Sequence, residues 1–151
     1  MIKGPGSCRA HLEIKDFQKK VPIVAIRIKR IILTALSKAR CKKFCEITVC
    51  FVDDRSIKKL NREFHHCNLA TDVLTFDLCP ENKKKIIADI VVSAETAVLN
   101  AKRFGTTCNY ELELYVVHGV LHLLGYNDLT IKQRNIMQDK AERILAFLDC
   151  K

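Results

Sequence analysis

The chain has 151 residues, 48% of them hydrophobic, and a formal net charge of +9 at pH 7. This length fits one domain that buries its own core, and the hydrophobic content excludes a wholly disordered chain. Apolar stretches such as residues 23–28, which Arg27 interrupts, are far shorter than the roughly 20 residues that cross a bilayer. We therefore predict a single domain over residues 1–151 with no membrane anchor.

The N-terminus and the cysteines both indicate a cytoplasmic protein. Residues 1–7 lack the apolar segment of a secretion signal, and residues 1–10 are interpreted as a flexible leader, with residues 4–7 either native or a cloning remnant. None of the eight cysteines forms the C-x2-C pair of zinc knuckles. We interpret them as free thiols in a reducing compartment, most of them small hydrophobic residues in or near the core.

The first half of the chain predicts two strands and two helices. A short strand is expected over residues 12–16, and residues 46–52 alternate as a second strand. Between them, apolar residues recur with helical spacing over residues 22–40, with Pro22 in the first turn. The two aspartates at 53–54 are typical of a turn and cap before a helix over residues 55–64.

The second half predicts two more strands and three helices. Residues 72–78 and 86–92 have the composition of strands. Helices are expected over residues 93–104, 108–124 and 130–148, and a glycine follows each of the first two. The order β-α-β-α-β-β-α-α-α predicts one mixed sheet of about four strands covered by about five helices, in the α/β or α+β class.

The segment from His118 to Asp128 carries the most specific chemical pattern. Histidines four residues apart lie on one face of a helix, where both imidazoles can bind one cation. The same spacing also occurs between histidines that have no shared role. Gly125 permits a left-handed turn that brings Asp128 back toward them. Three ligands leave one position open for water, as in catalytic zinc sites. We predict that His118, His122 and Asp128 bind one ion that activates water for hydrolysis.

A zinc peptidase differs from this pattern at one position. Its helix reads H-E-x-x-H, and the glutamate after the first histidine is the general base. Here that position is Gly119, which disfavours a peptidase. Tyr115 and Glu111 share the helical face of His118 one and two turns earlier. Glu111 either supports a ligand as a hydrogen-bond acceptor or is solvated.

Three segments of the chain resemble the YbeY endoribonuclease family. Residues 118–126 read HGVLHLLGY and resemble the family motif HGxLHLxGYDH. Leu60-Asn61 followed by ATDVLTF at residues 70–76 resembles the segment LN…PTDVLSF, and ADIVVSAE at residues 88–95 resembles GDI…S.E. The similarity spans about residues 46–145 in the family's order.

The resemblance implies a small α/β fold with a zincin-like metal helix and one zinc ion at a three-ligand site. It implies an endoribonuclease of ribosomal RNA maturation, acting at the 3′ end of 16S RNA and in ribosome quality control. Its partners are then the small ribosomal subunit and ribosomal proteins. Carried over by position, His118, His122 and Asp128 are the ligands, while Thr71 and Asp72 frame the cleft or cap the strand.

The chain departs from the family at three positions. The third ligand is usually histidine and here is Asp128. A carboxylate keeps zinc binding possible. Its negative charge leaves the bound water less acidic and favours other divalent ions somewhat. Asn127 replaces an aspartate. His65 stands where the family tends to carry an arginine that would clamp a phosphate. We assign His65 to the catalytic set, with an additional metal ligand or an exposed loop residue as alternatives.

The leading hypothesis combines the basic surface with the metal motif. A positive field attracts polyanions, and Lys58, Lys59 and Arg62 lie close in sequence to residues 64–76. They are the predicted RNA-binding residues, although a merely solvated helix face has the same composition. The alternatives are a non-catalytic, ribosome-associated RNA-binding factor with a structural metal and, less favoured, a zinc peptidase.

Overall fold

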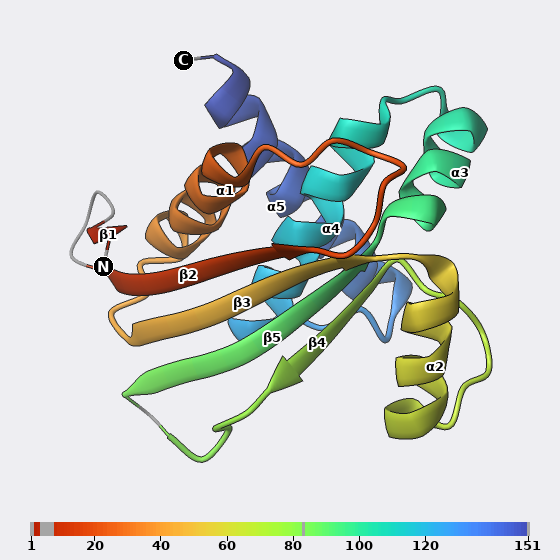
Figure 1. The fold of residues 1–151 in the computed structure, drawn as a ribbon. Helices are drawn as coiled ribbons and strands as arrows, with labels where there is room; N and C mark the ends of the chain where they lie inside the picture. The colour runs from red at the N-terminus through yellow and green to blue at the C-terminus, as the bar shows by residue number, and fades with distance from the viewer. Residues whose placement is uncertain (1, 4–7, 83, 151) are drawn as a thin grey trace.

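Figure 1 shows the secondary structure of the computed structural model, which describes residues 2–3, 8–82 and 84–150. The strands are β1 (Ile2–Lys3), β2 (Arg9–Asp16), β3 (Phe44–Val52), β4 (Val73–Asp77) and β5 (Lys85–Ser93). The helices are α1 (Ala25–Lys38), α2 (Asp54–His65), α3 (Ala94–Phe104), α4 (Cys108–Leu123) and α5 (Ile131–Asp149). Every predicted element is present in the predicted order, and most boundaries differ by one to three residues.

The strands form one mixed sheet in the order β1-β2-β3-β5-β4. Strands β2, β3 and β5 are parallel, whereas β1 and β4 run antiparallel to their neighbours at the two edges. Because parallel neighbours need a crossover, α1 joins β2 to β3, and α2 with β4 lies between β3 and β5. The predicted mixed sheet with five helices is confirmed as an α+β fold. The unpredicted strand is β1, which is too short to show any alternation.

The main core lies on one face of the sheet. Inward side chains such as Val49 and Ile90 are fully buried in the cluster that also contains residues of α1, α4 and α5, and these helices lie together on one side of the sheet in Figure 1. Helix α2 covers one corner of the opposite face, where Ile57 packs with Leu74 and Val91. Alternation along β5 assigns its neighbouring residues to opposite faces, so both clusters share that strand.

Residues 8–10 belong to the folded domain and are not a flexible leader. Cys8 is buried, and β2 begins directly after it. Strand β1 pairs with the first two residues of β2. The rest of the predicted leader, Met1 and residues 4–7, lies outside the described residues.

Helix α1 begins at Ala25, three residues after the predicted start at Pro22. The Gln18 side chain closes the preceding turn, because its Nε2 donates to the Val21 carbonyl and its Oε1 accepts from the Val21 amide. The chain leaves this turn extended as far as Val24, the residue before the helix. The buried members of the predicted apolar face are Ile28, Ile31 and Ala35.

Side-chain caps fix where four of the helices begin. The residues whose side chains accept a backbone hydrogen bond from the first turn are Asp53, Ser93, Thr107 and Thr130. Thr130 and Gln133 form a reciprocal capping box. At the end of α3, Gly105 has a φ of +68° and stops the helix, as predicted.

An ion-pair network ties α1 to α4 and α5. Nε and Nη2 of Arg27 donate to the two carboxylate oxygens of Glu113 at 3.0 and 2.9 Å, and Nη2 also donates to Asp149 at 2.7 Å. The hydrogen bonds to Glu113 raise the pKa of Arg27 above its ordinary value. Two-pronged arginine–carboxylate contacts have a defined geometry, so this network helps to fix how the three helices cross.

Candidate active site

Helix α4 carries both candidate histidines through the centre of the molecule. It packs against α1, α3, α5, β4 and β5, and most of its residues are buried. No helix within the described ranges is long and apolar enough to span a membrane. His118 and His122 lie one turn apart and line a cleft with the residues that precede and begin β4.

The chain turns back after α4, as predicted. Gly125 has a φ of +94°, a left-handed conformation that glycine adopts at little cost. The amide of Tyr126 donates to the Leu121 carbonyl at 3.0 Å, which closes the turn. Asp128 then lies beside the helix, with its Oδ2 3.7 Å from Nε2 of His122.

Both imidazoles have an Nε2 atom suited to a cation. Nδ1 of His122 lies 3.1 Å from the Tyr126 carbonyl oxygen. Because a carbonyl only accepts, the neutral ring that makes this bond has its proton on Nδ1 and a lone pair on Nε2. Nε2 of His118 is buried without a hydrogen-bond partner. Burial lowers the pKa of His118, so its ring is neutral at pH 7. A buried polar atom without a partner is costly, which fits a position that binds an ion.

The three predicted ligands line one cavity of about 290 Å³ between α4, β4 and α5. Asp128 is exposed, whereas His118 and His122 are half-buried. The three ligand atoms do not all lie within 4.8 Å of one another in the described part of the chain. A site made of these three side chains would therefore need at least one of them to shift.

Thr71 and Asp72 lie at this cleft and also cap the start of β4. Oδ1 of Asp72 accepts from the Val73 amide at 2.8 Å and from the Thr71 hydroxyl at 3.2 Å. Burial lowers the pKa of His118, and the negative charge of Asp72 partly offsets that effect. The two roles considered for these residues, in the cleft and at the strand entry, are thus compatible.

Sequence reasoning missed Arg134 and Gln138, which line the cleft from α5. Nη1 of Arg134 donates to the Asp128 carbonyl oxygen at 3.1 Å. The two residues are four apart and therefore share one face of the helix. That spacing was the available signal, but the sequence alone does not show that these two residues lie beside the end of α4.

A second cavity of about 550 Å³ adjoins the cleft and shares His118 with it. Glu111 and Tyr115 line this cavity from α4. Glu111 is only 4% exposed and accepts a hydrogen bond from the Thr106 hydroxyl, so it is not solvated. The Tyr115 hydroxyl accepts from the Asn100 amide at 2.7 Å. Both side chains thus have hydrogen-bond partners that themselves line the cavity.

His65 is the last residue of α2, so it is helical and not in a loop, and its side chain is exposed. Its ring stacks on Phe76 with 6.1 Å between ring centroids. His65 lines a hollow of about 310 Å³ with Thr75 and His122. His66 follows in the left-handed conformation that ends the helix. The structure thus brings one predicted catalytic residue from α2 next to a histidine of α4.

The predicted RNA-binding residues are exposed on α2. Lys58, Lys59 and Arg62 all point away from the buried side of the helix, which Ile57 and Asn61 form. Lys58, Arg62 and His65 follow one another at intervals of four and three residues, so they share a face. This basic stripe ends at the hollow that contains His122.

Gly119 allows α4 to lie close to the sheet. A Cβ atom built at this position would lie 2.7 Å from Cγ2 and 3.1 Å from Cδ1 of Ile90, a fully buried residue of β5. The position that holds the general base in H-E-x-x-H therefore faces the core. A glutamate placed here would meet Ile90.

Replacing Gly119 with alanine is expected to lower the free energy of unfolding by about 1 kcal/mol in urea titrations. Overpacking costs roughly 1–3 kcal/mol, and the gain in helix propensity offsets about 1 kcal/mol of it. Cγ2 sits next to the backbone and cannot swing away, so the clash dominates. In an Ile90→Ala background the same change should be neutral or stabilising. Equal destabilisation in both backgrounds would contradict the contact.

Comparison with known proteins gives one consistent result. A family model described as Endoribonuclease YbeY matches residues 13–149. An Endoribonuclease YbeY of Carboxydothermus hydrogenoformans is 34% identical over 140 residues, covering 90% of this chain and 96% of that protein. That of Parabacteroides distasonis is 33% identical over 139 residues, covering 91% and 96%. A solution structure titled TM1509 from Thermotoga maritima is 25% identical, covers 93% of each chain and gives a TM-score of 0.60.

Proposed function

Because this chain belongs to the YbeY endoribonuclease family, we propose that it is a metal-dependent endoribonuclease of ribosomal RNA maturation. The observation that carries the proposal is a cleft in which Nε2 of His118 has no hydrogen-bond partner and His122 is held through its other ring nitrogen. We further propose the 3′ end of 16S RNA as the substrate, the small ribosomal subunit and its proteins as partners, and a cytoplasmic location.

We infer that His118, His122 and Asp128 hold one divalent ion, with Zn²⁺ as the first candidate. When bound, the ion supplies positive charge that lowers the pKa of a coordinated water and stabilises charge on the phosphodiester. The chain itself orients the ligands. The Tyr126 carbonyl fixes the ring of His122, and Arg134 holds the backbone at Asp128.

Replacing Asp128 with histidine is expected to shift the acidic limb of the pH–rate profile for RNA cleavage to lower pH. The carboxylate places a negative charge beside the ion and keeps the coordinated water less acidic than a neutral imidazole would. The comparison uses metal-loaded proteins at equal occupancy, with Asp128→Asn as the matched variant that removes only the charge. A superimposable profile for Asp128→His would remove Asp128 from the ligand set.

The basic stripe of α2 is proposed to hold the RNA backbone. Replacing Lys58 and Arg62 together with alanine should weaken binding of single-stranded RNA and reduce the slope of log K against log salt by roughly 0.7 for each phosphate that is no longer neutralised. The matched control is Lys102→Ala, which removes an exposed charge from α3. Binding assays at several salt concentrations measure both quantities. An equal slope in all three proteins would place the RNA elsewhere.

The central experiment separates the enzyme from the two alternatives. Purified chain is treated with a chelator, and cleavage of a 16S 3′-end RNA is measured before and after Zn²⁺, Mn²⁺ or Mg²⁺ is added back. Activity that disappears with the chelator and returns with a metal supports the endoribonuclease. Unchanged RNA affinity without cleavage under any of these metals supports the RNA-binding factor. Hydrolysis of a denatured protein substrate would instead favour the peptidase.

A further inference from the structure

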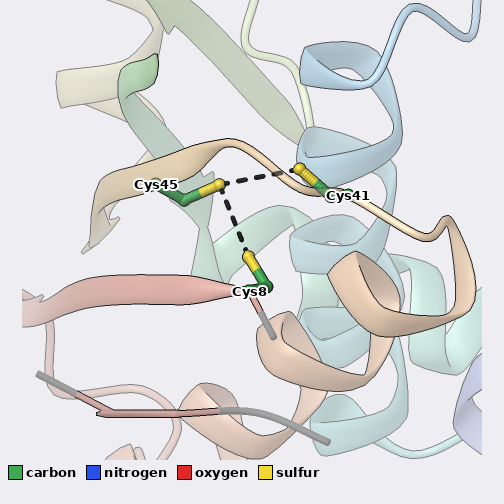
Figure 2. Close-up of side chains that lie close together, drawn as sticks. All are labelled: Cys8, Cys41 and Cys45. Carbon is green, nitrogen blue, oxygen red and sulfur yellow. Dashed lines mark hydrogen bonds between the residues drawn. The ribbon is translucent and has the colours of Figure 1, made fainter. Parts of the chain in front are cut away.

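Three buried cysteines from separate parts of the chain meet at one point (Figure 2). Cys8 precedes β2, Cys41 lies between α1 and β3, and Cys45 is in β3. Sγ of Cys45 lies 4.0 Å from Sγ of Cys8 and 3.9 Å from Sγ of Cys41, and all three sulfur atoms lie within 4.8 Å of one another. Within the described residues, no other three histidine, cysteine, aspartate or glutamate side chains gather as closely.

These spacings match a thiolate metal centre. With zinc–sulfur bonds of about 2.3 Å, neighbouring sulfur atoms lie about 3.8 Å apart in a tetrahedral site and about 4.0 Å apart in a trigonal one. A disulfide needs about 2.05 Å. A possible oxygen ligand lies beside the sulfur atoms. The thiols of Cys8 and Cys45 both donate to the Lys43 carbonyl oxygen at 3.5 Å.

The backbone around Cys41 is shaped to bring its thiol inward. Arg40 adopts a left-handed conformation with a φ of +53°, which is uncommon for a residue with a side chain. The Cys41 amide then donates to the Leu36 carbonyl at 3.0 Å and turns the chain back onto α1. The following residues, Lys42 and Lys43, are exposed. Two cationic side chains beside the trio offset part of the negative charge that thiolate ligands would bring.

The thiol trio is separate from the histidine cleft. Both places can be located along strand β5. Cys45 of the trio pairs with Ile86, whereas Val73 of the cleft pairs with Val92, six residues further on. Six residues along a strand correspond to about 20 Å. An ion at the trio would therefore neither share a ligand with His118 and His122 nor reach the reacting phosphodiester.

We propose that Cys8, Cys41 and Cys45 form a second metal site, which binds a thiophilic cation of the Zn²⁺ class. Thiolate sulfur is a preferred ligand of zinc. Binding replaces the thiol protons, which are released to solvent as the sulfur–metal bonds form. The ion would link the start of β2, the end of α1 and the start of β3, so the site is structural and independent of RNA hydrolysis.

The test uses Co²⁺ as a spectroscopic probe on the full chain, freed of metal by chelation and kept reduced. Wild type and His122→Ala are both expected to give the intense near-ultraviolet charge-transfer band of cobalt–thiolate bonds, which should saturate at one equivalent in His122→Ala, and Zn²⁺ should displace it. Cys45→Ser should lose the band. Cys108→Ser, which changes a half-buried cysteine outside the trio, should retain it.

The absence of a thiolate band in reduced, folded wild type would overturn the proposal and leave the cysteines as core residues. The decision does not depend on the variants, so poor folding of Cys45→Ser does not obscure it. A thermal midpoint that rises with Zn²⁺ concentration in His122→Ala gives a second reading, since that protein keeps only the thiol site intact. No Zn²⁺ effect in His122→Ala would likewise count against the site.

Discussion

Replacing His122 with alanine is expected to lower kcat/KM for RNA cleavage by at least about 100-fold while leaving RNA affinity nearly unchanged. Loss of a hydrogen-bond partner of a metal ligand already costs roughly 10–100-fold, and here the proposed ligand itself is removed. His122 is partly exposed at the C-terminal end of α4, so its truncation leaves the core intact. Steady-state cleavage and RNA binding are measured on the same preparations.

The matched control for this prediction is His11→Ala. His11 is an exposed histidine on β2, which the sheet order separates from the edge strand β4 at the cleft by β3 and β5. This variant should cleave RNA like wild type, and far-ultraviolet circular dichroism should show both variants folded. Full activity in His122→Ala would exclude His122 as a metal ligand.

Replacing Arg27 with methionine is expected to lower the free energy of unfolding by about 2 kcal/mol. The Arg27 side chain is 26% exposed and that of its partner Glu113 only 15%, so the variant leaves a largely buried side-chain carboxylate without its cationic partner. Methionine keeps the length of the side chain and much of its apolar contact. Urea denaturation of metal-free protein measures the difference.

Two further variants separate the network from a general loss of charge. Arg143→Met removes an arginine from an ion pair with Asp139, and the two side chains are 78% and 59% exposed. This change should lower the free energy of unfolding by no more than about 0.5 kcal/mol. Glu113→Gln in the Arg27→Met background should recover part of the stability, because it removes the unpaired charge. Equal effects of the Arg27 and Arg143 variants would rule out the proposed role of burial.

The order of elements and the fold class were predictable because local physics decides them. Alternation identified β3, and the glycine after Phe104 ended α3 where expected. The start of α1 was wrong because the turn is held by the Gln18 side chain, an interaction that periodicity does not encode. Residues 8–10 were assigned to a leader because their main partners, β3 and the thiols of residues 41 and 45, are distant in sequence.

The candidate site was partly predictable for the same reason. His118 and His122 share a helical face, and Gly125 indicates the turn, so one helix and its end contain the whole signal. Arg134 and Gln138 enter the cleft only through the packing of α5 on α4. The thiol trio was missed because zinc-knuckle spacing concerns pairs within one segment, whereas these three come from three segments.

The two sides of the histidine cleft differ in how firmly they are anchored. The imidazoles belong to the helix at the centre of the packing, whereas Asp128 belongs to an exposed turn whose backbone is contacted by the guanidinium of Arg134. Local opening takes place where few apolar groups are buried. At the proposed site an ion would therefore enter or leave by displacement of this turn, and we expect metal exchange on the timescale of loop motion and not of global unfolding.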